Sequence, residues 1–80
     1  MAYLLFTSPG EYAGKEVTVM LDGKQPFEAK VVKAKNANRK GTSYAVSTGR
    51  RKINVTYNGE VIYSKEIFVS TQETKIITLP

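Results

Sequence analysis

The sequence predicts an all-β fold, a small antiparallel sandwich or barrel of six to seven short strands in one domain over residues 1–80. Three observations support this prediction. Apolar and polar residues alternate along most of the chain, β-branched and aromatic residues fill many of these positions, and turn-forming pairs recur at intervals of about 8–12 residues. No stretch repeats apolar residues at the 3.6-residue period of a well-defined helix.

The clearest element is a hairpin centred on Asn58-Gly59. Residues 52–57 alternate polar and apolar side chains before this pair, and the largely apolar run 60–63 follows it. Asn and Gly accept the positive φ angles of a type I′ turn, whose twist matches that of the two strands. We expect the second strand to continue towards Val69. A bulge or a change of face is expected near Ser64-Lys65, because apolar residues occupy both parities of this strand.

Four other segments have strand patterns. The continuous apolar run 3–7 suits a strand buried on both faces or placed at a partner interface. Residues 16–21 alternate strictly and end at an Asp22-Gly23 turn, which predicts a strand with one inward face. Residues 44–46 and 74–79 complete the set.

Residues 27–35 allow two interpretations. Phe27, Ala29 and Val31 alternate with charged residues, which favours a strand. Ala29, Val32 and Lys33 also fit one side of a short helix. The β-branched pair Val31-Val32 favours the strand. A polar loop is expected to follow over residues 36–41.

Composition limits the chemistry that the chain can perform. It contains no cysteine and no histidine, so disulfides, cysteine-ligated metals and histidine-based acid–base catalysis are excluded. The seven acidic residues are scattered and show no spacing typical of a glycosidase pair. Asp22-Gly23 lacks the further oxygen ligands of a calcium loop. The sequence therefore predicts no enzyme, no metal and no cofactor.

Positive charge is concentrated in the middle of the chain. The net charge is +5, and residues 29–59 hold eight basic residues and no acidic one. Such a block attracts acidic partners. Solvated lysines on edge strands also discourage pairing between the sheets of different molecules, so the block could have this role alone. The arginines of Thr48-Gly49-Arg50-Arg51 have the geometry to grip a carboxylate or phosphate. The predicted partner-binding basic face consists of Lys33, Lys35, Arg39, Lys40, Arg50, Arg51 and Lys52.

The apolar amino-terminal strand also needs a partner. Tyr3, Leu4, Leu5 and Phe6 are predicted either to form an edge strand of the domain or to pair with another chain by strand addition. The segment is too short, and lacks the basic residues, for a signal peptide. No stretch has membrane-spanning length. We expect a full-length chain made in the cytoplasm and placed in a virion or surface assembly, or else an extracytoplasmic module excised from a longer protein.

The stretch from Val17 to Pro80 resembles the PEGA domain and the wider set of immunoglobulin-like and transthyretin-like surface modules. The similar residues are the run Val19–Lys24 with its Asp-Gly-Lys turn, Thr48-Gly49 followed by residues 52–57, the Asn58-Gly59 turn, and the last segment Ile76–Pro80. The resemblance implies a small β-sandwich and a non-enzymatic accessory role in surface or envelope assemblies.

These features lead to a preferred hypothesis and two others. The preferred one is a non-catalytic structural module whose basic face binds an acidic patch on other protein subunits, with self-association also open. A virion decoration (auxiliary capsid) protein or a surface-assembly module would be of this kind. The alternative is a small basic nucleic-acid-binding barrel in which Tyr44 and Tyr57 stack on bases, although both tyrosines keep the parity of the core. A sugar-binding module ranks third, because the chain has no tryptophan.

Overall fold

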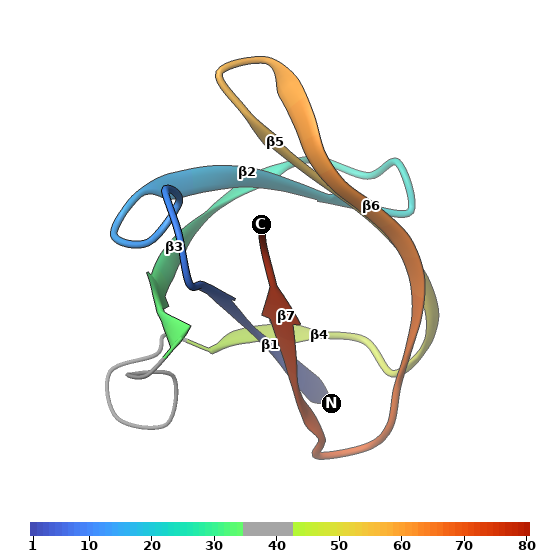
Figure 1. Cartoon of the computed structure of the whole chain (residues 1–80). Helices are drawn as coiled ribbons and strands as arrows, with labels where there is room; N and C mark the ends of the chain where they lie inside the picture. The colour runs from blue at the N-terminus through green and yellow to red at the C-terminus, as the bar shows by residue number, and fades with distance from the viewer. Residues whose placement is uncertain (35–42) are drawn as a thin grey trace.

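The computed structural model describes residues 1–34 and 43–80, and this part of the chain is all-β (Figure 1). The predicted loop 36–41 lies outside the described residues. The strand interpretation of the ambiguous segment is confirmed over Phe27–Lys33. The seven strands are β1 (Ala2–Ser8), β2 (Glu16–Leu21), β3 (Phe27–Lys33), β4 (Tyr44–Val46), β5 (Gly49–Tyr57), β6 (Glu60–Val69) and β7 (Thr74–Thr78).

The strands form one open sheet that is mixed, so the prediction of a purely antiparallel fold is wrong. The order is β4-β1-β3-β2-β5-β6. β4 and β3 pair with successive parts of one side of β1, and β7 pairs with its opposite side. β1 runs parallel to both β3 and β7, with Phe6 opposite Val31 and Tyr3 opposite Thr74. Turn signals in a sequence report hairpins between neighbouring strands, whereas these parallel partners are distant in sequence.

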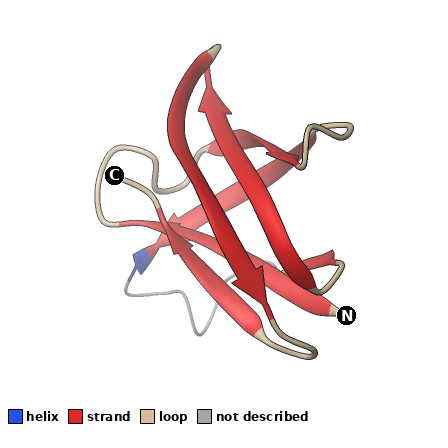
Figure 2. Cartoon of the chain, turned by 90° about the vertical axis from the view of Figure 1, so that its right-hand side faces the viewer, coloured by secondary structure: helices blue, strands red, loops and turns tan. Residues whose placement is uncertain are grey.

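The β5–β6 hairpin confirms the Asn58-Gly59 prediction. Asn58 and Gly59 have φ angles of 52° and 80°, as a type I′ turn requires. The register shifts opposite Val55 and Thr56, where Ile62 is the extra residue, so the bulge lies slightly before the predicted Ser64-Lys65 position. Figure 2 shows this hairpin as the longest strand pair of the molecule.

All seven strands contribute to a single principal core. Its largest fully buried side chains are Leu4, Phe6, Ile53, Ile77 and Leu79, which come from β1, β5, β7 and the residue after β7. Burying each side chain of this size contributes about 1.5–3 kcal/mol. Because inward-facing residues of distant strands meet in one cluster, the sheet bends around them, as Figure 1 shows.

A buried serine ties the end of β1 to the last described residue. The Ser8 hydroxyl donates a hydrogen bond to the Pro80 carbonyl at 2.8 Å and accepts one from the Gly10 N–H at 3.1 Å. Ser8 is fully buried, so the two bonds satisfy a hydroxyl that water cannot reach. The Leu79 N–H also donates to the Thr7 carbonyl at 2.7 Å. These contacts extend the pairing of β1 with β7 by two residues.

Candidate docking surface

An exposed phenyl ring and a set of charged side chains lie together on the outer side of the β5–β6 hairpin. Phe68 on β6 stands opposite Arg50 on β5, and Glu66 stands opposite Lys52. Phe68 is 61% exposed, which is unusual for a residue that gains so much from burial. Arg50 Nε and Glu66 Oε1 are 3.8 Å apart, with both side chains largely in solvent. We call Arg50, Lys52, Glu66 and Phe68 the Phe68 surface.

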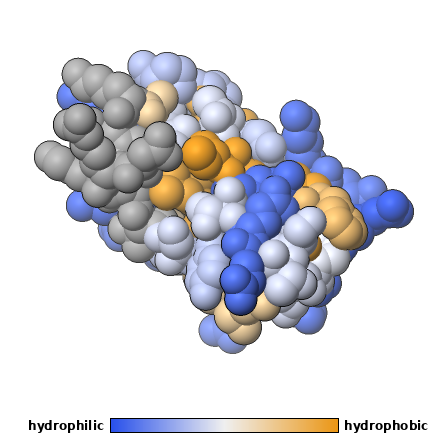
Figure 3. All heavy atoms as spheres, turned by 90° about the horizontal axis from the view of Figure 1, so that it is seen from below, coloured by the Kyte–Doolittle hydropathy of each residue, from blue (hydrophilic) through white to orange (hydrophobic). Residues whose placement is uncertain are grey.

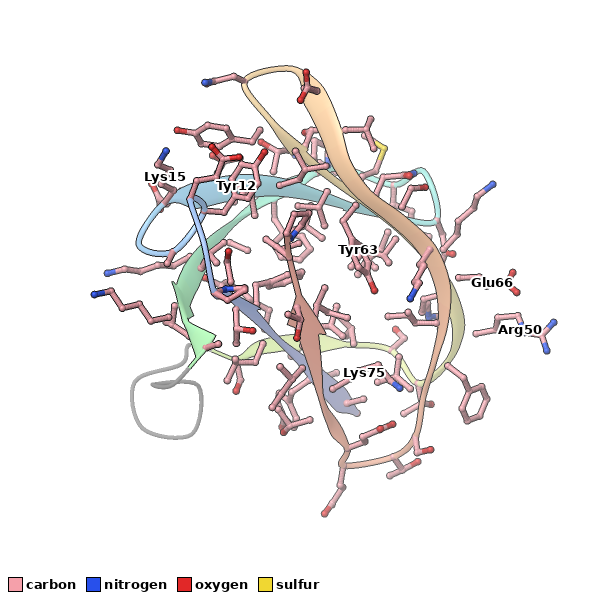
Figure 4. The ribbon with its side chains drawn as sticks, viewed as in Figure 1. Tyr12, Lys15, Arg50, Tyr63, Glu66 and Lys75 are labelled. Carbon is pink, nitrogen blue, oxygen red and sulfur yellow. The ribbon has the colours of Figure 1, made fainter. Side chains whose placement is uncertain are left out.

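The orientation of these side chains follows from strand alternation. Ile53 and Val55 on β5 are fully buried, so Arg50, Lys52 and Asn54 must point to the opposite face. Figure 4 shows Arg50 and Glu66 pointing away from the interior, whereas Tyr63 on β6 points inward. The Phe68 surface therefore presents two cations, one anion and one apolar ring to any partner.

Arg51, by contrast, is committed to bonds within the chain. Its guanidinium contacts the Asp22 carboxylate at 3.1 Å and donates hydrogen bonds to the carbonyls of Ser47 at 3.2 Å and Thr48 at 2.8 Å. Only about a quarter of each side chain of the Arg51–Asp22 pair is exposed. This arrangement fastens the β4–β5 turn to the end of β2, and we call it the Arg51 clasp.

The other partner of the Arg51 clasp is held as a carboxylate. Asp22 accepts a hydrogen bond from the Lys52 N–H at 2.8 Å, and its own N–H donates to the Lys52 carbonyl. The Lys52 N–H, followed by the Arg51 guanidinium, lowers the pKa of Asp22, while partial desolvation opposes this effect. Asp22 has a φ of 53°, which an Asp-Gly turn tolerates.

Of the predicted basic face, the structure describes Lys33, Arg50, Arg51 and Lys52, and these four do not form one patch. Val19 pairs with both Phe27 and Val55, so β3 and β5 run in the same direction across β2. Lys33 lies six residues beyond Phe27, and Lys52 lies three residues before Val55. The two lysines are therefore about nine residue positions apart along the strands, up to ~30 Å at ~3.3 Å per residue. Arg50 and Lys52 are the predicted cations that come together on one exposed face. Lys35, Arg39 and Lys40 lie outside the described residues.

The amino-terminal segment is an interior strand buried on both faces, as one expectation for it had it, and the predictions of an edge strand and of strand addition are corrected. Over Tyr3, Leu4, Leu5 and Phe6, β1 pairs with β7 on one side and with β4 and then β3 on the other. Leu4 and Phe6 are fully buried, Leu5 is buried beside Val32, and only Tyr3 reaches the surface. This segment is neither an edge strand nor open to strand addition, because its backbone groups already have partners in the sheet.

The two tyrosines considered for base stacking pack within the fold. Tyr44 lies against Phe27, with ring centroids 5.6 Å apart, and its hydroxyl accepts a hydrogen bond from the Lys30 N–H at 2.7 Å. Tyr57 makes an edge contact with Tyr12 at 5.5 Å. Both rings also lie against the principal core. Partial burial, with nearby carboxylates, raises the pKa of Tyr12.

Two surface hollows lie away from the Phe68 surface. One has a volume of about 300 Å³ and is lined by residues that include Leu21, Phe27 and the Arg51 clasp. Of the predicted cations that the structure describes, Arg51 reaches this hollow, and Lys24 also lines it. The other hollow, of about 440 Å³, has Lys33 and residues 8–10 on its wall. Among residues 1–34 and 43–80, no group of three or more acidic side chains is placed to hold a metal ion.

Sequence reasoning overlooked the apolar residues that reach the surface. Tyr3, Val61, Phe68 and Ile76 are exposed, as is Met1. Figure 3 shows hydrophobic residues at one face of the molecule, with hydrophilic residues beside them. Phe68 has the opposite parity to the buried Val69, and its register across from Arg50 places it on the outer face. Within the described residues no helix has the length and apolar character needed to cross a membrane.

Comparison with known proteins gives no relative. No family model, no curated protein and no solved structure matches the chain. The functional assignment therefore rests on the side chains and their arrangement.

Proposed function

We propose that the chain is a non-catalytic accessory module that binds other protein subunits through the Phe68 surface. The observation that carries this proposal is an aromatic ring that is 61% exposed and stands across from a largely exposed arginine. Aromatic residues and arginine are enriched at protein interfaces, where they supply most of the binding energy. The flanking Lys52 favours an acidic partner, because complementary charge speeds association and fixes orientation.

The partner class follows from the same surface. We propose a protein lattice or surface assembly with an acidic, partly apolar patch, as in the decoration of a virion capsid. The PEGA-like or immunoglobulin-like sandwich belongs to this proposal. It is supported by two hydrogen-bonded sets, one of β1, β4 and β7 and one of β2, β5 and β6, that are joined through β3 around one core.

Site-specific photo-cross-linking tests this function. A photoreactive phenylalanine analogue at Phe68 should trap a discrete protein in cells that make the chain, and the double substitution Arg50→Glu with Lys52→Glu should reduce the yield at least several-fold. The matched control places the same analogue at Glu16, an exposed position on β2. Equal trapping from both positions, or no trapped protein from Phe68, refutes the proposal.

A second measurement separates protein binding from nucleic-acid binding. A fluorescent random oligonucleotide should not bind at low salt if the cations serve a protein partner. Binding whose logarithm falls linearly with the logarithm of salt concentration, and which weakens on replacing Arg50 and Lys52 by alanine, would instead support the nucleic-acid-binding barrel. Arg51 is left unchanged in this test, because removing it would also release the Arg51 clasp.

A further inference from the structure

In the part of the chain that the structure describes, three strands have a free edge, and the longest of them, β6, borders the Phe68 surface. β6 pairs only with β5, whereas β4 and β7 each pair only with β1. β6 spans ten residues and β7 five. An edge strand presents a row of unpaired N–H and C=O groups, which is the template for adding a strand from another chain. β6 and β7 follow each other in the sequence, and Figure 2 shows them diverging from their connecting turn.

A lysine stands near the middle of the free β6 edge. Lys65 lies opposite the buried Ile53, so it belongs to the core-facing row of β6, yet it is exposed. Its ammonium lies 5.9 Å from the centre of the Tyr63 ring. None of the ion pairs formed among the described residues includes Lys65. A charge on the core-facing side of an edge strand is a recognised protection against indiscriminate pairing.

The position of this charge discriminates against a second copy of the chain. The exposed apolar residues of β6 are Val61 and Phe68, at its two ends. Consider two β6 strands that pair antiparallel, with Phe68 of each strand opposite Val61 of the other. Because the bulged Ile62 does not count in the register, the midpoint between Val61 and Phe68 is Lys65. Two lysines would then stand directly opposite each other, which is unfavourable. The same site is favourable for a strand that carries a carboxylate opposite Lys65.

We propose that β6 accepts an extended, acidic segment of a partner protein as an added antiparallel strand, with a carboxylate opposite Lys65 and an apolar residue opposite Phe68. This inference rests on the proposed protein-binding function and specifies how the partner is bound. Antiparallel addition places these two partner residues three positions apart, with the apolar one first. A second apolar residue would meet Ile67 on the core-facing side, where β6 already packs against the core.

The test uses two blocked peptides that differ at one position. The first is Thr-Val-Val-Thr-Glu-Thr-Val-Thr, and its twin has Lys in place of Glu. Titrated to millimolar concentration into the ¹⁵N-labelled chain, the Glu peptide should shift the amide signals of Ser64–Phe68 and slow their hydrogen exchange. It should bind roughly two- to tenfold more tightly than the Lys twin, as expected for a cross-strand ion pair compared with a like-charge pair.

Charge reversal supplies the decisive variant and its control. Lys65→Glu should invert the preference between the two peptides, whereas Lys30→Glu, at an exposed position on the interior strand β3, should leave it unchanged. The inference is overturned if neither peptide perturbs β6, if both bind equally, or if the unmodified chain pairs with itself through β6. Cross-linking from Phe68 without peptide binding would overturn strand addition alone, whereas failure of both experiments would also remove the proposed function.

Discussion

Replacing Arg51 by methionine should destabilise the fold far more than the same change at the neighbouring Arg50. Methionine keeps most of the apolar stem of the side chain and removes the guanidinium. Arg51 donates hydrogen bonds to two main-chain carbonyls of the β4–β5 turn, at 3.2 and 2.8 Å. Arg50 makes one contact of 3.8 Å with an exposed glutamate. The adjacent positions on one strand thus provide a matched pair.

The expected size of the effect follows from these contacts. A hydrogen bond from a charged donor contributes about 1.5–3 kcal/mol when buried, and about 1 kcal/mol each is reasonable at this partial exposure. Arg51→Met should therefore lower the free energy of unfolding by about 2 kcal/mol, leaving the ion pair with Asp22 out of the sum. For a domain of this size, 2 kcal/mol corresponds to a fall in Tm of roughly 8–16 °C. Arg50→Met should change stability by less than about 0.5 kcal/mol.

Urea and thermal unfolding, followed by circular dichroism on both variants, measure this difference. Equal destabilisation by the two substitutions would show that the Arg51 clasp contributes nothing beyond an ordinary surface arginine. Partner binding should show the reverse order, because Arg50 belongs to the Phe68 surface and Arg51 does not. The pair of variants therefore separates stability from docking.

Three further outcomes are expected. The pKa of Asp22 is lower in the folded chain than the ordinary value of about 3.9, so its stabilising effect is complete above that pH and is lost as pH falls through the folded pKa. Asp22→Asn should therefore reduce the loss of stability at acid pH, measured by unfolding curves recorded between pH 5 and pH 2. Gly59→Ala should cost about 1 kcal/mol in denaturant titrations because Gly59 has a φ of 80°, whereas Gly10→Ala, at an ordinary φ with 3.7 Å to the nearest atom, should be neutral or stabilising. Ser8→Ala should cost about 1–2 kcal/mol, measured in the same way, because it removes both hydrogen bonds of the buried hydroxyl, and Ser8→Gly should not restore the loss.

Local signals in the sequence were sufficient to predict the hairpin and most strands. Asn58-Gly59 and the alternation before it specify a turn and a register with no information from elsewhere in the chain. Val31-Val32 decided correctly between strand and helix for β3. The parallel pairing of β1 was missed because it depends on which distant strands cover the two edges of β1, and no local pattern encodes this choice.

The candidate site was predicted less completely, for a related reason. A run of basic residues gives the charge of a segment but does not give the direction of each side chain. Arg50 and Arg51 are adjacent, and strand alternation sends one into solvent and the other into an internal clasp. Phe68 could be recognised as a surface residue only after its register with Arg50 was known, because the bulge at Ile62 resets the parity of β6.

The placement of β1 between β3 and β7 has a consequence for biosynthesis. Tyr3 is synthesised some seventy residues before its partner Thr74. Until Thr74–Thr78 has been synthesised, the apolar run of β1 lacks one of its flanking strands, and the long loop closure slows its capture. We expect the nascent polypeptide to expose Leu4, Leu5 and Phe6 to chaperones until β7 has been made, and the native structure to form in one cooperative step after that.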